Sequence, residues 1–450
     1  MTAVVFVANR GEIALRILTA CRGLGLRTVL GVSAADRDSM PAALADRTVV
    51  LGGARADRSY LAQDTVLAAA LGTGCTAIHP GYGFLSENAA FAEACAANGL
   101  TFIGPSPQAL RRLGDKIEAR ELAESLGVPV SPGGTAVSPE EVHRLAESIG
   151  YPLLIKAAHG GGGKGMKLVT GPEELTSAWQ VASGEALAAF GHGAVFMERF
   201  VERARHVEVQ ILGDRHGGRL HVGERDCTVQ YRYQKVIEES ASEGLTPEDR
   251  RVLTESALRI AAELDYVGLG TVEFLFDEST GAISFLEVNP RLQVEHPVTE
   301  AATGIDLVRE QIQACLGEPL SFKQSDVVFR GHAVECRITA QDPARGLAPS
   351  PGTLRRWRPP RRGGLRLDSH MYEGYRFPPF YDALMGKLVA WGEDRARAID
   401  LMSDALAEFE IEGFPTSLGL LRRIVADPDF RANRIHTNWL TERLENEAHS

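Results

Sequence analysis

Residues 271–288 read TVEFLFDESTGAISFLEV, two apolar segments joined by a polar stretch. TVEFLF and ISFLEV carry the β-branched and aromatic residues typical of strands, and DESTG between them predicts a hairpin turn. If the hairpin is symmetric, Glu273 lies directly opposite Glu287. Like charges in that arrangement destabilise a sheet, whereas a divalent cation held between them stabilises it. The stretch therefore predicts an antiparallel, metal-binding hairpin.

The polar residues after the hairpin extend this prediction. Asn289 follows Glu287 on the same face and offers a third oxygen, so Glu273, Glu287 and Asn289 are candidate ligands for Mg²⁺ or Mn²⁺. A slip of one residue in the register would instead move the partner to the other face of the sheet. Two solvated carboxylates on an exposed face are the alternative, which the apolar flanks disfavour.

The composition is that of an ordinary globular protein. The chain has 450 residues, 44% hydrophobic and 24% charged, which suggests about three domains. Its formal net charge of −11 argues against a nucleic-acid partner, which needs a basic stripe. The six cysteines contain no C-x-x-C pair, so neither a zinc site nor a disulfide framework is predicted. With no evident signal peptide or membrane span, we expect a cytoplasmic protein that does not bind membranes.

The N-terminal third alternates short apolar runs with segments of helical spacing, beginning with AVVFVA (3–8) and GEIALRILTACRGLG (11–25). This alternation predicts a doubly wound parallel α/β domain. Such sheets place ligand loops at the carboxyl ends of their strands. The loops expected here are NRGE (9–12) and HPGYGFLSEN (79–88). From residue 151 onward the chain is strand-rich, with a long helix expected over 247–264.

The glycine run HGGGGKGM (159–166) lies between two strand-like segments. A dinucleotide fingerprint requires a helix after it, and a Walker A loop requires Ser or Thr after Lys164, so the run fits neither. It predicts a hairpin tip whose N–H groups close over phosphates, with a mobile surface hairpin as the alternative. Lys156 in the preceding apolar segment is costly to bury without an anion, which favours nucleotide binding.

The segment RHVEVQIL (205–212) alternates two kinds of side chain. Val207, Val209 and Ile211 share one face, which is typical of a core, and the intervening polar residues share the other. The polar face of this strand is a candidate floor for a cleft.

Together, the glycine hairpin, the strand lysine and the paired carboxylates suggest ATP-grasp architecture, and the chain resembles the biotin carboxylase family. The resemblance runs from ANRGEIALRI (8–17) to FYDALMGKL (380–388). It rests on segments found in the family's order: HPGYGFLSEN, GGGGKGM, RHVEVQ, ERDCTVQ, QKVIEE, EFLF, RLQVEHPVTE and GHAVECRI.

The resemblance implies a fold of mixed α/β and α+β class with three parts. These are an N-terminal Rossmann-like doubly wound domain (1–114), an ATP-grasp domain with a mobile lid (115–330, lid about 131–203) and a C-terminal biotin carboxylase domain (331–450).

The resemblance also implies residue roles. The metal ligands are Glu273, Glu287 and Asn289, as the hairpin predicts. The bicarbonate site is Lys235, Arg291, Gln293 and Val294, and the catalytic residues are Glu295, Arg291, Lys235 and Arg337. The nucleotide is expected to contact Lys116, Lys156, Gly160, Gly161, Gly162, Gly163, Lys164, Gly165, Glu198, Val201, His206, Gln230, Tyr233 and Leu275.

The implied reaction uses ATP, Mg²⁺ and bicarbonate to make carboxyphosphate and then carboxylate biotin. Glu295 would deprotonate bicarbonate held by Lys235 and Arg291, and Arg337 would stabilise the biotin enolate oxygen. Because the sequence has no M-K-M-type lysine motif, biotin is expected as a substrate on a separate biotin carboxyl carrier protein. The expected partners also include a carboxyltransferase subunit of an acetyl-CoA or acyl-CoA carboxylase, serving fatty acid synthesis, and a second copy of the chain in a homodimer.

The sequence departs from the family pattern at three places. In QYRYQK (230–235), Tyr231 replaces an arginine and Tyr233 replaces a histidine, and Pro290 stands where many relatives have threonine. We expect altered ATP affinity and retained chemistry. Two other functions are weighed: an ATP-grasp ligase for a different carboxylate, and a catalytically silent nucleotide-binding scaffold. The intact catalytic set disfavours both of these functions, and only the two tyrosines favour the second.

Overall fold

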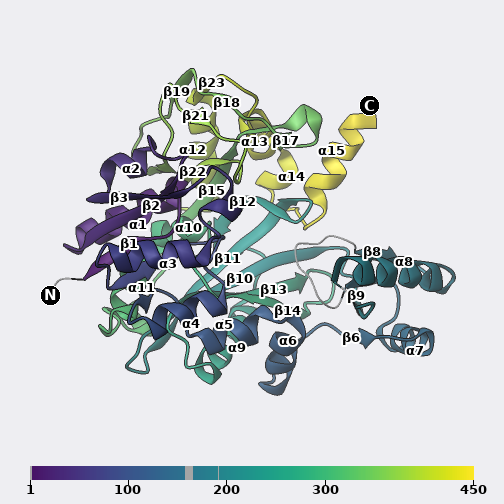
Figure 1. The fold of residues 1–450 in the computed structure, drawn as a ribbon. Helices are drawn as coiled ribbons and strands as arrows, with labels where there is room; N and C mark the ends of the chain where they lie inside the picture. Colours follow the sequence, from purple (N-terminus) through teal and green to yellow (C-terminus); the bar gives the residue numbers. More distant parts are fainter. Residues whose placement is uncertain (1–2, 158–165, 191, 450) are drawn as a thin grey trace.

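The computed structural model describes residues 3–157, 166–190 and 192–449. Its N-terminal part is a five-stranded parallel sheet in the order β3-β2-β1-β4-β5, and it appears in purple and dark blue in Figure 1. Its elements are β1 (Val4–Val7), α1 (Gly11–Gly23), β2 (Arg27–Ser33), α2 (Met40–Leu44), β3 (Arg47–Gly52), α3 (Gln63–Gly72), β4 (Ala77–His79), α4 (Ala89–Ala97) and β5 (Thr101–Phe102).

Successive residues of β1 enter two different hydrophobic cores. Val5 and Val7 pack with α1, while Phe6 between them packs with α3 and α4. A strand buried on both faces reads as a continuous apolar run, which is why AVVFVA predicted this position correctly. Beyond β1, the Asn9 side-chain amide donates to the Pro80 carbonyl at 2.6 Å. The two loops expected at the carboxyl edge of the sheet therefore meet.

Two helices, α5 (Pro107–Gly114) and α6 (Lys116–Ser125), lead from this sheet into a small lobe. The lobe has a four-stranded antiparallel sheet in the order β6-β9-β7-β8, with two helices beside it, at the lower right of Figure 1. It lies within the predicted lid segment. Its elements are β6 (Gly133–Ala136), α7 (Pro139–Ile149), β7 (Leu153–Ala157), β8 (Lys167–Val169), α8 (Pro172–Phe190) and β9 (Val195–Arg199).

The rest of the chain is organised by one eight-stranded antiparallel sheet, in the order β14-β13-β10-β11-β12-β15-β22-β20. Its first five strands come from the predicted ATP-grasp domain. They and the nearby helices are β10 (Ala204–Gly213), β11 (Arg219–Tyr231), β12 (Gln234–Ser240), α9 (Pro247–Glu263), β13 (Gly268–Asp277), β14 (Ile283–Asn289), α10 (His296–Thr303) and α11 (Leu307–Cys315). The long helix expected over 247–264 is confirmed as α9.

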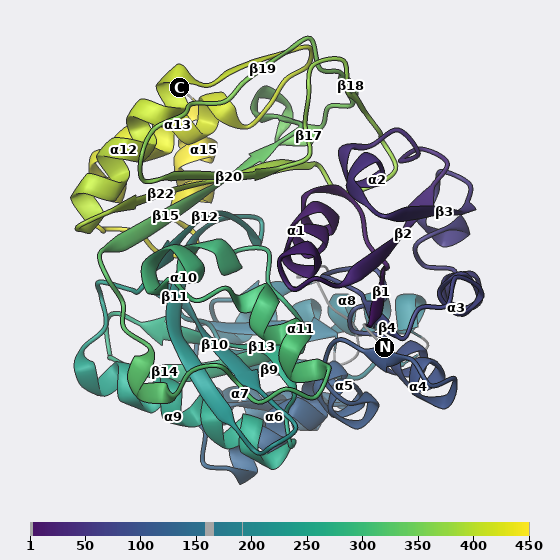
Figure 2. The ribbon, with the colours of Figure 1, turned by 90° about the vertical axis from the view of Figure 1, so that its left-hand side faces the viewer.

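The sheet continues without interruption into the C-terminal part, because β12 pairs with β15. The C-terminal elements are β15 (His332–Thr339), β20 (Leu365–Ser369), β22 (Leu384–Gly392), α12 (Arg395–Glu408), α13 (Leu418–Ala426), α14 (Pro428–Arg431) and α15 (Trp439–His449), with short strands β16 (Gln341–Asp342), β17 (Ala348–Pro349), β18 (Gly352–Thr353), β19 (Arg356–Arg358), β21 (Arg376–Phe377) and β23 (Glu410–Glu412). Figure 2 shows α12 and α13 along one side of β22 and β15.

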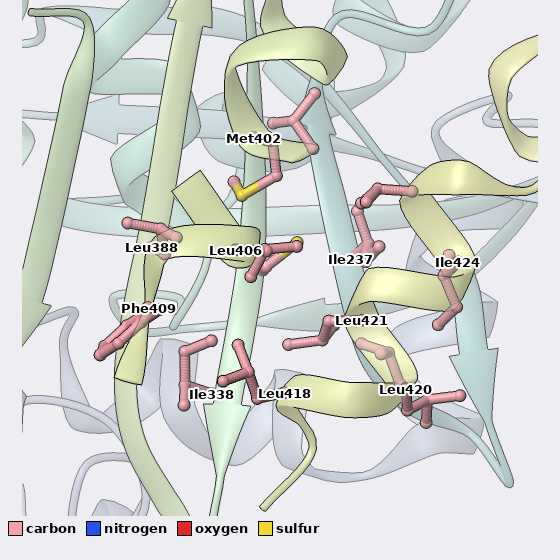
Figure 3. Close-up of a cluster of buried hydrophobic side chains, with 14 of the residues drawn as sticks. Ile237, Ile338, Leu388, Met402, Leu406, Phe409, Leu418, Leu420, Leu421 and Ile424 are labelled. Atoms are coloured by element: carbon pink, nitrogen blue, oxygen red, sulfur yellow. The ribbon is translucent and has the colours of Figure 1, made fainter. Parts of the chain in front are cut away.

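The two faces of this C-terminal sheet have different coverings. On one face Ile237, Ile338 and Leu388 from three neighbouring strands pack against Met402 and Leu421 of α12 and α13 (Figure 3). The opposite face is covered by α10, where Val298 packs on Ala333 and Val389. Charged side chains of β12, β15 and β22 lie on that second face, and they contribute to the site described next.

Candidate active site

The hairpin of β13 and β14 places the predicted metal ligands together. Glu273 pairs with Glu287 across the two strands, and Thr271 pairs with Asn289. The Asn289 side-chain amide donates to Glu273 Oε1 at 2.8 Å. The symmetric register therefore holds on this side of the hairpin. It shifts by one residue between Glu273 and Phe274, so the turn itself is not symmetric.

Lys235 on β12 connects three carboxylates. Its ammonium lies 2.6 Å from Glu208, 2.9 Å from Glu273 and 2.6 Å from Glu295. The lysine side chain is 12% exposed, and all three partners are buried. Two of these carboxylates also pair with an arginine, Glu208 with Arg225 and Glu295 with Arg337, so the buried positive and negative charges of the cluster balance.

Glu295 lies at the N-cap of α10 and is fully buried. One of its oxygens accepts from Lys235, and the other accepts from Arg337 Nη2 at 3.0 Å. Burial by itself raises the pKa of this carboxyl group, but the charges of Lys235, Arg337 and Arg225 exceed that effect and hold the pKa below its usual range. Glu295 is therefore an ionised carboxylate between two cations.

Arg225 on β11 organises the floor of the site, although no role was predicted for this residue. It is completely buried and bonds to Glu208 at 2.5 Å and to Gln210 at 2.8 Å. Thr271 and Thr299 also accept from it at 3.1 Å. Its guanidinium thus satisfies the polar face of β10 predicted from RHVEVQIL. The signal available in the sequence was the alternation of GERDCTVQ, which places Arg225 on the same face pattern as Cys227.

The residues expected to hold bicarbonate lie at the end of β14 and before α10. Arg291 donates to Glu87 at 2.5 Å, to Asn289 at 3.0 Å and to Gln293 at 2.9 Å. Glu87 belongs to the loop 79–88, so this loop does reach the site. Gln293 donates in turn to Glu273 at 3.2 Å.

Val294 is held from behind by a buried lysine. Lys387 on β22 is fully buried, and it donates to the Val294 carbonyl at 2.8 Å. The same ammonium lies 3.1 Å from Glu12 of α1, which accepts from the Tyr82 hydroxyl. Segments from the N-terminal, central and C-terminal parts thus fix one backbone carbonyl. The sequence assigned no role to Lys387 or Glu12.

Several residues expected to bind the nucleotide lie between the large sheet and the lobe. Lys116 pairs with Glu287 at 2.8 Å, and Lys156 pairs with Glu198 at 2.8 Å. Partners of the remaining polar residues are within the same sheet: His206 Nε2 lies 2.9 Å from Glu273, and His206 Nδ1 lies 2.7 Å from the Gln230 amide. Leu275 and Val201 are half-buried. Gly160, Gly161, Gly162, Gly163, Lys164 and Gly165 lie outside the described residues.

The substituted tyrosines have different surroundings. Tyr231 packs against the hydrophobic core of the C-terminal part. Tyr233 is 62% exposed. It forms the two-residue turn between β11 and β12 with Arg232, and both have positive φ, +49° for Arg232 and +65° for Tyr233. Such a turn matches the twist of a hairpin. Neither tyrosine enters the carboxylate cluster. Pro290 is buried next to Asn289.

The residues of the hairpin fit a hard divalent cation. Glu273 and Glu287 offer carboxylate oxygens from adjacent strands, and Asn289 offers an amide oxygen, which are the ligands that Mg²⁺ prefers. Glu273 also lies in a buried group with His206 and Glu208 whose potential ligand atoms are within 4.8 Å of one another. The Glu287 side chain is 36% exposed and is paired with Lys116, so a cation can approach it from solvent.

Comparisons with known proteins agree with this geometry. The family model for the biotin carboxylase N-terminal domain matches residues 1–110, and the model for its C-terminal domain matches residues 335–442. Between them, the model for the ATP-binding domain of the carbamoyl-phosphate synthase L chain matches residues 115–323. The three models together define a carboxylase built around an ATP-grasp domain.

Relatives of known identity span the whole chain. A biotin carboxylase of Nostoc sp. is 48% identical over 440 residues, covering 97% of this chain and 98% of the relative. A biotin carboxylase of Pseudomonas aeruginosa is 45% identical and covers 99% of each chain. The chain belongs to the biotin carboxylase family.

Solved structures give the same result. The biotin carboxylase domain dimer of the Hydrogenobacter thermophilus 2-oxoglutarate carboxylase, in complex with MgADP, ADP and bicarbonate, matches with a TM-score of 0.93 and 42% identity over 98% of each chain. A biotin carboxylase of Campylobacter jejuni in complex with β-γ-ATP also matches with a TM-score of 0.93 and 42% identity, covering 98% of this chain and 99% of the other. The fold class, family and ligase class predicted from the sequence are thereby confirmed, as is the expected use of ATP and Mg²⁺.

Proposed function

We propose that this chain carboxylates biotin in two steps at the cluster around Lys235. Bicarbonate first takes the γ-phosphoryl group of ATP to give carboxyphosphate and ADP. Carboxyphosphate breaks down to CO₂ and phosphate, and the biotin ureido nitrogen then attacks the CO₂. The observation that carries the proposal is Glu295, a buried carboxylate placed between Lys235 and Arg337. A scaffold that only binds nucleotide has no need to bury an acid between two cations.

Bicarbonate binds where the cations of the cluster meet the end of β14. Lys235 and Arg291 supply its positive charge, Gln293 supplies an amide, and the backbone of Val294 supplies a fixed wall. Arg291 is already oriented by Glu87 and Asn289, so little side-chain freedom is lost when the anion binds.

Glu295 takes the proton from bicarbonate. A carboxylate whose pKa is held low by two cations is a weak base. When bicarbonate binds, Lys235 and Arg337 also interact with the substrate anion, so they stabilise the Glu295 carboxylate less. The pKa of Glu295 then rises, and the carboxylate becomes a stronger base. The same cations thus orient the base and release it when the anion arrives.

The nucleotide lies between the large sheet and the lobe, with its phosphates toward the β13–β14 hairpin. Lys116 and Lys156 hold phosphate oxygens, and Glu198, Val201, His206, Gln230, Tyr233 and Leu275 line the rest of the site. Residues 160–165 are proposed to close over the phosphates. A Mg²⁺ ion held by Glu273, Glu287 and Asn289 would supply charge neutralisation for phosphoryl transfer.

Arg337 serves the second step. Its guanidinium donates through Nη2 to Glu295 at 3.0 Å and through Nε to Glu238 at 2.5 Å. A permanently charged planar donor is suited to stabilise the ureido enolate of biotin, while the phosphate released from carboxyphosphate accepts the N1′ proton.

Domain boundaries, partners and compartment are also part of the proposal. We place the domains at 1–114, 115–330 (with the lid about 131–203) and 331–450, supported by family matches to 1–110, 115–323 and 335–442. The continuous sheet means that the third domain folds onto the second. A biotin carboxyl carrier protein and a carboxyltransferase subunit of an acetyl-CoA or acyl-CoA carboxylase are the proposed partners. A homodimer is supported by the dimeric 2-oxoglutarate carboxylase relative.

A cytoplasmic location is proposed from the free, buried state of all six cysteines. Among the described helices, none has the length and apolar character needed to cross a bilayer.

The experiment that tests the proposal is phosphate release from ATP with Mg²⁺ and bicarbonate, with and without free biotin. Wild type should be stimulated by biotin. Glu295→Gln should lose bicarbonate-dependent turnover, and Arg337→Ala should lose only the stimulation by biotin. The proposal fails if biotin changes nothing in wild type and both variants behave as wild type does.

A further inference from the structure

A pair of buried carboxyl groups lies directly behind Arg337. Glu238 on β12 and Glu335 on β15 are opposite each other in the sheet, and both are fully buried. Opposed side chains share one face with Cβ atoms about 4.5–5.5 Å apart. Glu238 Oε1 accepts from Arg337 Nε at 2.5 Å. Within the described part of the chain, the second oxygen of Glu238 and both oxygens of Glu335 have no hydrogen-bond donor.

The surrounding cations cannot neutralise two additional carboxylates. Lys235 is shared among three other carboxylates, and Lys387 donates to the Val294 carbonyl. Arg337 is already shared between Glu238 and Glu295. Titratable and charged groups from five elements interact electrostatically with the pair: Lys235 on β12, Arg337 and Cys336 on β15, Lys387 on β22, Glu295 at the start of α10, and Cys227 on β11.

A proton held between the two carboxyl groups accounts for both the close approach of two buried acids and their oxygens without a donor. It removes the like-charge repulsion, and it supplies the donor that the unpaired oxygens lack. Burial raises the pKa of Glu238 to about 7, although the charge of Arg337 opposes this shift. Burial and the neighbouring Glu238 raise the pKa of Glu335 well above its usual range. Each direction agrees with a pair that retains one proton at neutral pH.

We infer that Glu238 and Glu335 share one proton and together position Arg337 for biotin. With the proton present, the pair carries a single negative charge that holds Arg337 through Nε and leaves its Nη atoms directed to the active site. When the proton is lost, a second buried negative charge attracts the guanidinium toward the sheet and away from biotin. The pair then sets the alkaline limit of the second step. This inference rests on the proposed role of Arg337.

The test compares pH profiles of kcat/KM for biotin in wild type, Glu335→Gln and Glu238→Gln. Glutamine at position 335 mimics the protonated acid, so the variant should retain activity near neutral pH and lose it about one pH unit or more higher than wild type. Glutamine at position 238 removes the charge that holds Arg337, so kcat/KM for biotin should fall about ten- to a hundredfold. The KM for ATP should change in neither variant, whereas general damage to the fold would change the KM for ATP as well.

Infrared difference spectroscopy gives a readout that does not depend on activity. Wild type should show a protonated carboxylic acid band at neutral pH that disappears in Glu335→Gln and that titrates with the alkaline loss of activity. The inference is overturned if wild type lacks this band, or if wild type and Glu335→Gln lose activity at the same pH. Arg337→Ala distinguishes failure of this inference from failure of the proposed function. Unchanged biotin stimulation in that variant would overturn the proposed function itself.

Discussion

Replacing Lys235 by methionine tests the charge balance of the site. The substitution keeps the length of the side chain and removes the ammonium shared by Glu208, Glu273 and Glu295. Removing one partner of a buried ion pair costs about 3–5 kcal/mol, because the remaining charge stays buried. Each carboxylate keeps another partner, such as Arg225 for Glu208. We therefore expect the free energy of unfolding at pH 8 to fall by about 3–5 kcal/mol in total and not by that amount for each pair.

The loss should depend on pH in a defined direction. In wild type the pKa values of Glu273 and Glu295 are lowered, chiefly by Lys235 acting against burial. Their stabilising contribution is fully present above about pH 4.3, the pKa of an unfolded glutamate, and is lost only as pH falls through the lowered values. In the variant, Lys235 no longer opposes burial, so both pKa values lie higher than in wild type and the folded variant takes up protons at a higher pH than wild type does. The difference from wild type should be largest at pH 8 and should narrow toward pH 5.

The assay is urea unfolding of both proteins from pH 5 to pH 8, since urea leaves charges unscreened. Lys167→Met is the matched control, because the Lys167 side chain is 31% exposed and pairs with the 48% exposed Glu185. Its cost should stay within about 1 kcal/mol at every pH. A loss in Lys235→Met that equals the control, or that grows toward low pH, would refute the charge balance described for the cluster.

Three further predictions address other parts of the molecule. Lys387→Met removes the donor that fixes the Val294 carbonyl, so the KM for bicarbonate should rise about tenfold in steady-state assays. The KM for ATP should stay unchanged. Equal effects on the two KM values would contradict a role of Lys387 in the bicarbonate site. Asp36→Asn breaks the buried ion pair with Arg10, which has contacts of 2.8 and 2.9 Å. The substitution should lower the free energy of unfolding by about 3–5 kcal/mol at neutral pH. Because Arg10 lowers the pKa of Asp36 against the effect of burial, the stability difference from wild type should disappear as pH falls through the lowered pKa. Chelation by EDTA should stop phosphate release without changing the circular dichroism spectrum, and excess Mg²⁺ should restore it.

The sequence predicted those features that depend on local patterns. Alternation with a period of two placed Val207 and Val209 in the core and Glu208 on the polar face, and all three positions agree with the structure. The pairing of Glu273 with Glu287 followed from a short turn between two strands. The one-residue shift next to Glu273 was not predictable, because a bulge depends on packing that the local sequence does not specify.

Contacts between distant parts of the chain were beyond such patterns. Lys387 looks like an ordinary polar residue of a strand, but β15 and α10 enclose it, and its partners Glu12 and Val294 come from other parts. The role of Arg225 likewise depends on partners from β10, β13 and α10, which come together only in the folded chain. The continuity of the large sheet across residues 330 and 331 arises from the pairing of β12 with β15, which are separated by about ninety residues of chain.

Transfer of labelled carbon from bicarbonate to biotin tests the proposed function at its central step. The purified chain, supplied with ATP, Mg²⁺, free biotin and labelled bicarbonate, should form acid-labile labelled carboxybiotin. Formation should require ATP and should be lost in Glu295→Gln and in Arg337→Ala. The proposed carboxylation of biotin would be wrong if ATP were hydrolysed at a rate set by bicarbonate while no label entered biotin, or if both variants transferred label as wild type does.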